Sequence, residues 1–151
     1  MPVFISHKRE DKDNALRMAA HLKANGITCY VDVLDPTLKT TDDITETIMQ
    51  RVKQCTHLMA LVSSYTERSW WVPFEIGVAT EIDRRISSFQ SGNSALPEFL
   101  TKWPVLKTIT DLDTFIRLYK RDTTVPIREG KVAHATIRSA SQFHRELKAS
   151  L

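Results

Sequence analysis

The 151-residue sequence predicts an α/β fold of the flavodoxin-like class, with a parallel sheet of about five strands and helices on both faces. Short apolar segments alternate with amphipathic segments along most of the chain, and this alternation is typical of βαβ units with right-handed crossovers. Residues 57–62 are apolar without alternation, as expected for a central strand that helices cover on both faces. The length and the 42% hydrophobic content fit one compact domain.

The apolar pattern near the start of the chain predicts a strand, a helix and a second strand. Residues 3–5 form a short β-prone run. The helix that follows has four apolar residues on its expected buried face: Ala15, Leu16, Ala19 and Leu22. Gly26 suits the left-handed position just after this helix. Residues 27–31 then form the second strand, which ends at Asp32.

Turn-forming residues around Pro36 predict a loop over residues 32–43, and a second helix follows this loop. Asp43 and Glu46 are spaced as an N-terminal capping pair for the second helix. The expected buried face of this helix consists of Ile44, Ile48, Val52 and Cys55. The third strand covers residues 57–62.

A third helix is expected to begin between Ser69 and Pro73, because proline is tolerated in the first turn, and to run to about Arg85. Four later elements are expected: strands over residues 86–90 and 105–109, and helices over residues 111–120 and 141–150. We expect residues 1–120 to form the core of the domain. Residues 121–151 are then a C-terminal extension whose final helix packs on the same domain.

Composition and charge argue against several classes of function. The net charge of +3 and the pI of about 9.0 are mildly basic, but acidic residues interleave with basic ones, so no nucleic-acid partner is expected. Two cysteines and five histidines show no ligand spacing, which predicts neither a metal site nor a disulfide framework. No signal sequence or membrane span is recognisable, so we expect a cytoplasmic protein that does not associate with membranes.

Ligands of such a sheet bind beyond the carboxyl ends of the strands, at the point where strand order reverses between the first and third strands. Polar residues that follow the predicted strands should therefore converge on one cleft. These residues are Ser6, His7, Lys8 and Arg9 after the first strand, Asp32 and Asp35 after the second, and Ser63 and Ser64 after the third. The alternative for each of them is an ordinary solvated loop residue.

Glu75 stands out among the candidate catalytic residues because of its helical neighbours. The residues three and four positions away, which share its side of the helix, are Trp71, Val72, Val78 and Ala79. None of them can pair with a carboxylate. Burial among such groups favours the neutral carboxyl, whereas the nearby helix N-terminus favours the charged form, and the sequence leaves this balance open. The alternative is an exposed glutamate at the rim of an amphipathic helix.

The four glycines of the chain form no glycine-rich phosphate loop, so a bound phosphate must be contacted by side chains. Lys8 and Arg9 are the nearest candidates, since charged donors form strong hydrogen bonds with phosphate. Trp70, Trp71 and Phe74 gather at the start of the third helix. At least one of these rings is expected to reach a cleft or an interface, where it can stack on a base or a nicotinamide. Core packing is the alternative for these rings.

Two motifs resemble those of Toll/interleukin-1 receptor (TIR) domains. Residues 3–7, Val-Phe-Ile-Ser-His, resemble the opening strand of the family, and residues 69–76, Ser-Trp-Trp-Val-Pro-Phe-Glu-Ile, are similar to its Ser-x-Trp-Cys-x-x-Glu-Leu box. The resemblance covers about residues 1–85 and implies the flavodoxin-like TIR fold. Many members of this family cleave NAD⁺, and the glutamate that Glu75 matches is their catalytic residue.

The resemblance further implies the residues that surround the ligand. The tryptophan that Trp71 matches lies beside the ligand, and the segment of Ser6 and residues 7–9 lines the same pocket. Asp32 would border the cleft. NAD⁺ is then a substrate, and no cofactor is implied.

A TIR domain of this length resembles bacterial antiphage proteins of the Thoeris type, which convert NAD⁺ into a diffusible signalling nucleotide for a separate effector. Self-association through TIR surfaces is also implied. The product stays open between a cyclic ADP-ribose isomer, a conjugate and ADP-ribose, as do the trigger, the mode of assembly and the role of residues 121–151. Two alternatives remain: a non-catalytic TIR interaction module, and a nucleoside or nucleotide N-glycosidase.

Overall fold

The fold is built on five parallel strands, as the alternating sequence pattern predicts. The computed structural model describes residues 1–31, 41–123 and 139–151. The strands follow the order β2-β1-β3-β4-β5 across the sheet. Their bounds are β1 (Val3–Ser6), β2 (Cys29–Val31), β3 (His57–Val62), β4 (Arg85–Gln90) and β5 (Val105–Leu106). The predicted α/β, flavodoxin-like class is therefore confirmed.

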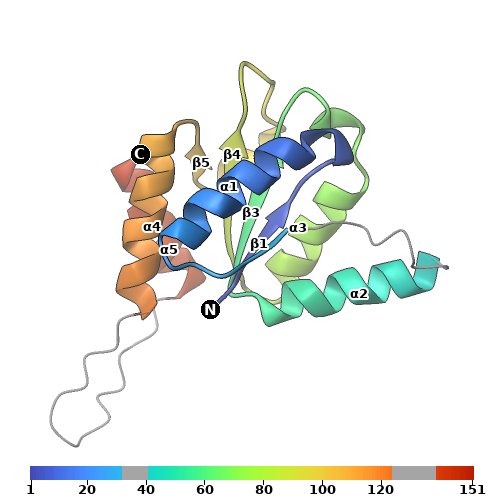
Figure 1. Cartoon of the computed structure of the whole chain (residues 1–151), viewed down its shortest axis with the longest axis horizontal. Coiled ribbons are helices and arrows are strands. Elements are labelled where there is room, and N and C mark those ends of the chain that lie inside the picture. Colours follow the sequence, from blue (N-terminus) through green and yellow to red (C-terminus); the bar gives the residue numbers. More distant parts are fainter. Residues whose placement is uncertain (32–40, 124–138) are drawn as a thin grey trace, which may run out of the picture.

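Helices cover both faces of the sheet (Figure 1). One face carries α1 (Lys12–Ala24), α4 (Ile109–Thr123) and α5 (Ala140–Ser150), and the other carries α2 (Thr41–Gln54) and α3 (Trp71–Glu81). Successive strand residues point to opposite faces. Val3 and Ile5 accordingly belong to the hydrophobic cluster under α1, α4 and α5, whereas Phe4 belongs to the cluster under α2 and α3. Three short 3₁₀ turns complete the described elements: η1 (Arg9–Asp11), η2 (Thr66–Arg68) and η3 (Glu98–Lys102).

The buried face of α1 differs from the prediction at one position. Leu16 is 45% exposed, and Met18 is buried in its place. Met18 lies three residues after Ala15 and four before Leu22, which is the spacing of one helical face. Leu16 is rotated by about 100° from Ala15 and so points away from the sheet. Leu16 lies three residues before Ala19, so helical spacing alone does not distinguish it from Met18.

The second strand begins two residues later than predicted. Gly26 has a φ of 80°, which confirms the left-handed position after α1. The N–H group of Ile27 donates to the carbonyl of Leu22 at 3.0 Å, so Ile27 still belongs to the end of the helix. The strand therefore starts at Cys29. The predicted loop over residues 32–43 lies mostly outside the described residues.

The second helix begins at Thr41, two residues before the predicted capping residue Asp43. The predicted buried face holds for Ile48, Val52 and Cys55, which are almost fully buried, while Ile44 is partly buried.

The third helix ends at Glu81 and not near Arg85. The N–H group of Arg84 donates to the carbonyl of Ala79 at 2.9 Å, and Asp83 adopts a φ of 52°. These are features of a Schellman-type helix end, in which the left-handed position is more often occupied by glycine. Arg85 is instead the first residue of β4.

The last predicted strand is shorter than expected because a helix cap interrupts it. The Asp111 carboxylate accepts hydrogen bonds from the N–H groups of Lys107 and Thr108, at 2.7 and 3.0 Å. The Thr108 hydroxyl accepts one from the N–H group of Asp111 at 3.1 Å. This reciprocal capping starts α4 at Ile109, so the strand cannot extend to that residue.

The final helix packs on the same sheet as the rest of the chain. Phe143 and Leu147 of α5 are fully buried in the cluster that α1 and α4 form with the strands. Ser139 caps the helix in a capping box with Gln142. The division of the chain into residues 1–120 and 121–151 stays a prediction, and residues 124–138 lie outside the described residues.

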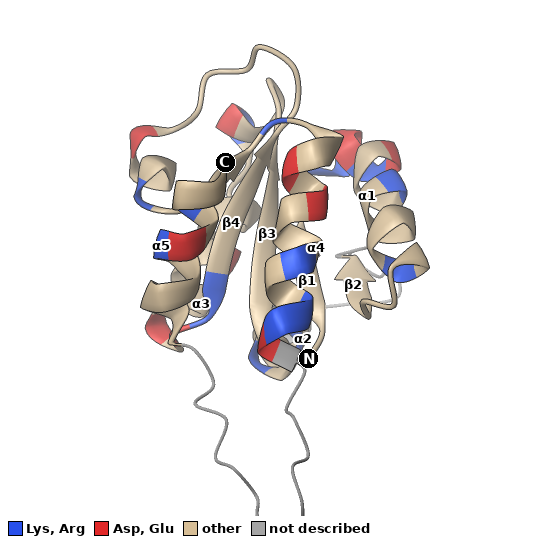
Figure 2. Ribbon diagram, turned by 90° about the vertical axis from the view of Figure 1, so that its left-hand side faces the viewer, with Lys and Arg blue, Asp and Glu red and all other residues tan. Residues whose placement is uncertain are grey.

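Charged residues are confined almost entirely to the helices and loops (Figure 2). Lys and Arg are interspersed with Asp and Glu there, and Arg85 is the one charged residue in the five described strands. None of the helices that the structure describes is both long enough and apolar enough to span a membrane.

Candidate active site

The candidate site lies at the carboxyl edge of the sheet, where β1 and β3 are neighbours. The connection through α1 leads from β1 to β2 on one side, and the connection through α2 leads to β3 on the other side. The strand order therefore reverses at this position, as the sequence pattern predicts. Loops that follow such neighbouring strands separate and leave room for a ligand.

Glu75 lies on the side of α3 that faces the sheet and is 0% exposed. The hydroxyl of Ser6, the last residue of β1, donates a hydrogen bond to the Oε2 atom of Glu75. Ser6 is itself fully buried. The alternative of an exposed glutamate at the helix rim is therefore wrong. Two residues that were selected from different motifs are brought into direct contact.

The three residues after Ser6 differ in their exposure. His7 is buried, Lys8 is partly buried and Arg9 is exposed. The Lys8 ammonium forms an ion pair with Glu10 at 3.5 Å. Solvent screens an ion pair at the surface, so the Lys8 ammonium can exchange Glu10 for another anion at small energetic cost. Lys8 and Arg9 are thus placed near the mouth of β1.

The aromatic residues at the start of α3 divide between packing and solvent. Trp71 is partly buried and meets Phe74 edge to face, with 5.9 Å between the ring centroids. Trp70 is 90% exposed. The prediction that at least one of these rings leaves the core agrees with the exposure of Trp70, although Trp71 was the ring assigned to the ligand. Asp32 and Asp35 lie outside the described residues.

A second hydrogen-bonded pair at the same edge was not predicted. The Ser63 hydroxyl, just after β3, donates to the Oδ2 atom of Asp11 at 2.5 Å, and both residues are buried. The Ser63 hydroxyl also accepts from the N–H group of Tyr65 at 3.1 Å, and the Ser63 N–H donates to Thr66 Oγ1 at 2.9 Å. This network ties the loop after β1 to the loop after β3. The signal that was overlooked is Asp11, an acidic residue between a strand and a helix.

Within the described ranges of the chain, Glu75 does not line the cavities of about 420 and 440 Å³. Among the residues that the structure describes, no group of three or more His, Cys, Asp or Glu side chains is placed to hold a metal ion. The described residues at the carboxyl edge include two buried carboxylates, Glu75 and Asp11, each bonded to a serine hydroxyl.

The profile of the TIR domain matches residues 3–123. The chain belongs to the TIR domain family. The match includes all five strands and α3, so both motifs that resemble the TIR family fall within it. Family membership covers NAD⁺-cleaving enzymes as well as adaptor modules, and so it leaves the activity of this TIR domain open.

Solved structures support the fold assignment. Twenty-seven chains match, among them the TIR domain of the Toll-related receptor TRR-2 from Hydra magnipapillata. That structure has a TM-score of 0.64 and 19% sequence identity to this chain, and the alignment covers 80% of this chain and 95% of the receptor domain. Identity at this level shows a shared fold and nothing about activity. A comparison with curated proteins gave no match.

Proposed function

We propose that this TIR domain cleaves the bond between nicotinamide and ribose in NAD⁺, with Glu75 as the catalytic residue. The observation that carries the proposal is a buried carboxylate at the carboxyl edge of the sheet, bonded to the hydroxyl of Ser6. Burying a carboxylate is costly unless it is hydrogen-bonded, so a fully buried carboxylate at the ligand-binding edge of a parallel sheet is a candidate functional group.

The chemistry of NAD⁺ cleavage suits a single carboxylate. Positive charge develops on the ribose as the glycosidic bond breaks, while the nicotinamide is already cationic and leaves as a neutral molecule. No general acid is needed for such a leaving group. A carboxylate beside the ribose stabilises the oxocarbenium character, as the stabilising carboxylate does in glycoside hydrolysis.

Substrate access requires the groups that cover Glu75 to move, because Glu75 is fully buried in the structure. A ribose hydroxyl can replace the Ser6 hydroxyl as the donor, so the number of hydrogen bonds to the carboxylate is conserved. Lys8 and Arg9 are proposed to contact the phosphates and Trp71 to stack on a ring of the substrate. His7 and Asp32 complete the proposed binding residues.

The proposed biological role is the production of a signalling nucleotide in antiphage defence. A diffusible product derived from ADP-ribose would reach a separate effector, and self-association through TIR surfaces would assemble the active form. The nucleophile that captures the ribose decides between a cyclic isomer, a conjugate and ADP-ribose.

A second candidate function is a protein-interaction module. Trp70 is 90% exposed and Tyr65 is 52% exposed, and both lie in the segment between β3 and α3. Exposed aromatic residues of this size are typical of protein contacts. In this case NAD⁺ would be left intact, and Trp70→Ala would abolish self-association.

The test measures the release of nicotinamide from NAD⁺ by chromatography. The protein concentration is varied up to values at which the TIR domains self-associate. Wild type should release nicotinamide, and Glu75→Gln should lower the rate by about 10²-fold or more, the typical loss of one electrostatic stabiliser. Glu81→Gln, an exposed change on the same helix, is the matched control. If wild type releases no nicotinamide at any concentration, the proposal is contradicted. Cleavage of a free nucleoside in preference to NAD⁺ would favour the N-glycosidase alternative.

A further inference from the structure

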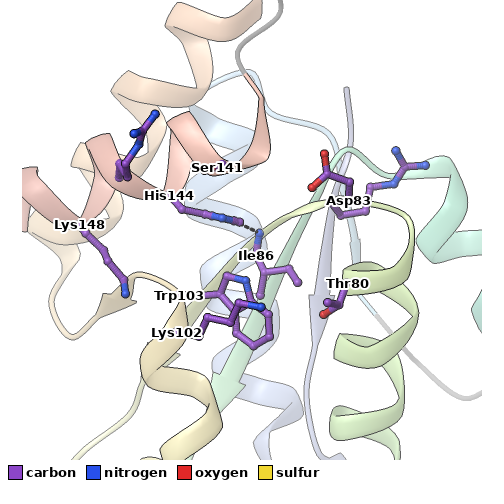
Figure 3. A pocket seen from close by; sticks show the side chains of 10 residues that line it. Thr80, Asp83, Ile86, Lys102, Trp103, Ser141, His144 and Lys148 are labelled. Carbon is purple, nitrogen blue, oxygen red and sulfur yellow. Dashed lines mark hydrogen bonds between the residues drawn. The ribbon is translucent and has the colours of Figure 1, made fainter.

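A cavity of about 420 Å³ opens at the amino edge of the sheet, on the opposite edge from Ser6 (Figure 3). Its walls come from the end of α3, the start of β4, the segment around η3 and one side of α5. The volume is in the range of small-molecule sites. Its α5 wall lies beyond residue 123, where the match to the TIR family ends, so this wall belongs to the present chain and not to the family pattern.

Four basic side chains line the cavity against one acidic side chain. The basic residues are Arg84, Lys102, Arg145 and Lys148, and the acidic residue is Asp83. Four positive charges and one negative charge leave an excess of three positive charges. In the part of the chain that the structure describes, no carboxylate forms an ion pair with any of the four. Like charges gathered at one cavity repel each other, and a bound anion relieves that repulsion.

Three of these cations contact uncharged groups, namely two backbone carbonyls and one aromatic ring. The Arg84 guanidinium donates to the carbonyl of Lys53 at 2.6 Å, and the Lys148 ammonium donates to the carbonyl of Thr101 at 2.9 Å. The Lys102 ammonium lies 5.4 Å from the centroid of the Trp103 ring. A lysine has three donors and an arginine has five, so each of these groups keeps further donors for a ligand.

His144 contributes a fixed neutral group. Its Nε2 atom accepts a hydrogen bond from the N–H group of Ile86 at 2.8 Å, shown as the dashed line in Figure 3. The pKa of His144 is lowered to about 4, chiefly by burial; Asp83 opposes this lowering, and the nearby cations Arg85, Lys148 and Lys102 contribute to it. At neutral pH the ring is therefore uncharged and carries its proton on Nδ1, since Nε2 is the acceptor.

We propose that this cavity is a second binding site, which takes a small phosphorylated molecule with at least two negative charges. Guanidinium and ammonium groups form charge-assisted hydrogen bonds with phosphate oxygens, and Trp103 and Ile86 provide an apolar wall for the rest of the ligand. The site is independent of the proposed cleavage of NAD⁺, because it shares no residue with the carboxyl edge.

The experiment titrates the full chain with inorganic pyrophosphate and with ADP at fixed ionic strength. Calorimetry gives the affinity, and ¹H–¹⁵N NMR locates the ligand. The expected result is saturable binding of at least one probe, with shifts of the Ile86 N–H and the Trp103 indole N–H signals. Adenosine, which has no phosphate, should not bind there.

The variant Arg145→Ser/Lys148→Ser removes two exposed cations of α5 and should weaken binding by at least about tenfold. Lys12→Ser/Arg17→Ser removes the same charge from exposed positions of α1 and is the matched control, expected to keep the affinity of wild type. Thermal unfolding of both variants verifies that they are folded. Equal affinities of the two variants, shifts confined to the surroundings of Ser6, or no saturable binding of either probe at millimolar concentration would overturn the proposal.

Discussion

The buried carboxylates of Asp122 and Glu75 have different surroundings. Asp122 lies 3.2 Å from the Arg85 guanidinium, and both side chains are almost completely buried on the face of α4 and α5. Glu75 lies on the opposite face and accepts a hydrogen bond from the Ser6 hydroxyl. A guanidinium and a carboxylate fixed inside a core are a permanent structural pair. A hydroxyl donor can be replaced by a hydroxyl of a substrate, so the second arrangement suits a site that exchanges partners.

The surroundings of the two groups reinforce this difference. The Arg85 guanidinium lies 5.9 Å from the centroid of the Phe143 ring, and His57 contacts the rings of Phe115, Tyr119 and Phe143. Aromatic packing fills the space around the ion pair. The carboxyl edge instead contains the Ser63 and Asp11 network between two loops.

The largest effect on stability is expected at the ion pair. Asp122→Ala leaves the buried Arg85 charge without this partner and should lower the free energy of unfolding by about 3–5 kcal/mol. Asp113→Ala, on the same helix, is the control, because Asp113 is exposed in its 2.8 Å pair with His21. That change should lower stability by about 1 kcal/mol or less. Urea unfolding measures both values, and equal losses would break the distinction between structural and exchangeable pairs.

The loop network should be the next most sensitive feature. Ser63→Ala removes the donor to the buried Asp11 carboxylate and the acceptor of the Tyr65 N–H, which should lower the free energy of unfolding by about 1–3 kcal/mol. Ser64→Ala changes an exposed neighbour and should stay within about 0.5 kcal/mol of wild type. Chemical denaturation checks both. A neutral effect of Ser63→Ala would show that the two loops are held together by other contacts.

The free energy of unfolding should depend on pH through two buried histidines, His144 and His57. Burial lowers the pKa of His144 from 6.5 to about 4, and burial lowers the pKa of His57 well below 6.5. The unfolded chain therefore binds more protons, and stability is lost as pH falls from about 6.5 towards 4. His144→Gln should flatten part of this slope and leave the part that arises from His57. Thermal melts between pH 4 and 7 measure it, and an unchanged slope would contradict the assignment.

The smallest effect is expected at the helix end beside the cationic cavity. Asp83 has a φ of 52°, a conformation that glycine adopts more easily. Asp83→Gly should raise the free energy of unfolding by about 0.5–1 kcal/mol. Asp83→Asn is the control, since it removes the charge and retains the left-handed preference. A loss of stability in both variants would mean that the carboxylate, placed among four cations, matters more than the backbone strain.

The sequence predicted the strand order reversal, Ser6 and Glu75 because each depends on local pattern: an apolar strand, a polar residue after it, and a helix rich in apolar residues. The pair of Ser63 and Asp11 could not be predicted in this way, because a hydrogen bond between distant segments leaves no periodic signal. Arg85 was assigned to a helix end for the same reason. Arg85 is a charged residue at the start of a strand, and Asp122 of α4, far away in sequence, lies against it in the buried interior.

The cavity lined by basic residues could not be predicted from the sequence pattern either. Its basic residues are dispersed among acidic ones along the chain, so they form no charge block. They gather only because α5 packs beside the end of α3 and the start of β4. The errors in the buried face of α1, at Leu16, and in the start of α2, at Asp43, have a simpler origin. Helix faces and helix ends can shift by one or two residues with little change in apolar spacing.

The proposed cleavage of NAD⁺ requires the charge of Glu75 and not its contribution to packing. Thermal unfolding and nicotinamide release, measured on the same preparation of Glu75→Gln, separate the two. Glutamine can accept the Ser6 hydrogen bond through its amide oxygen, so the melting temperature should stay within a few degrees of wild type while nicotinamide release falls by about 10²-fold or more. Release within about tenfold of wild type, from a protein that is still folded, would contradict the claim.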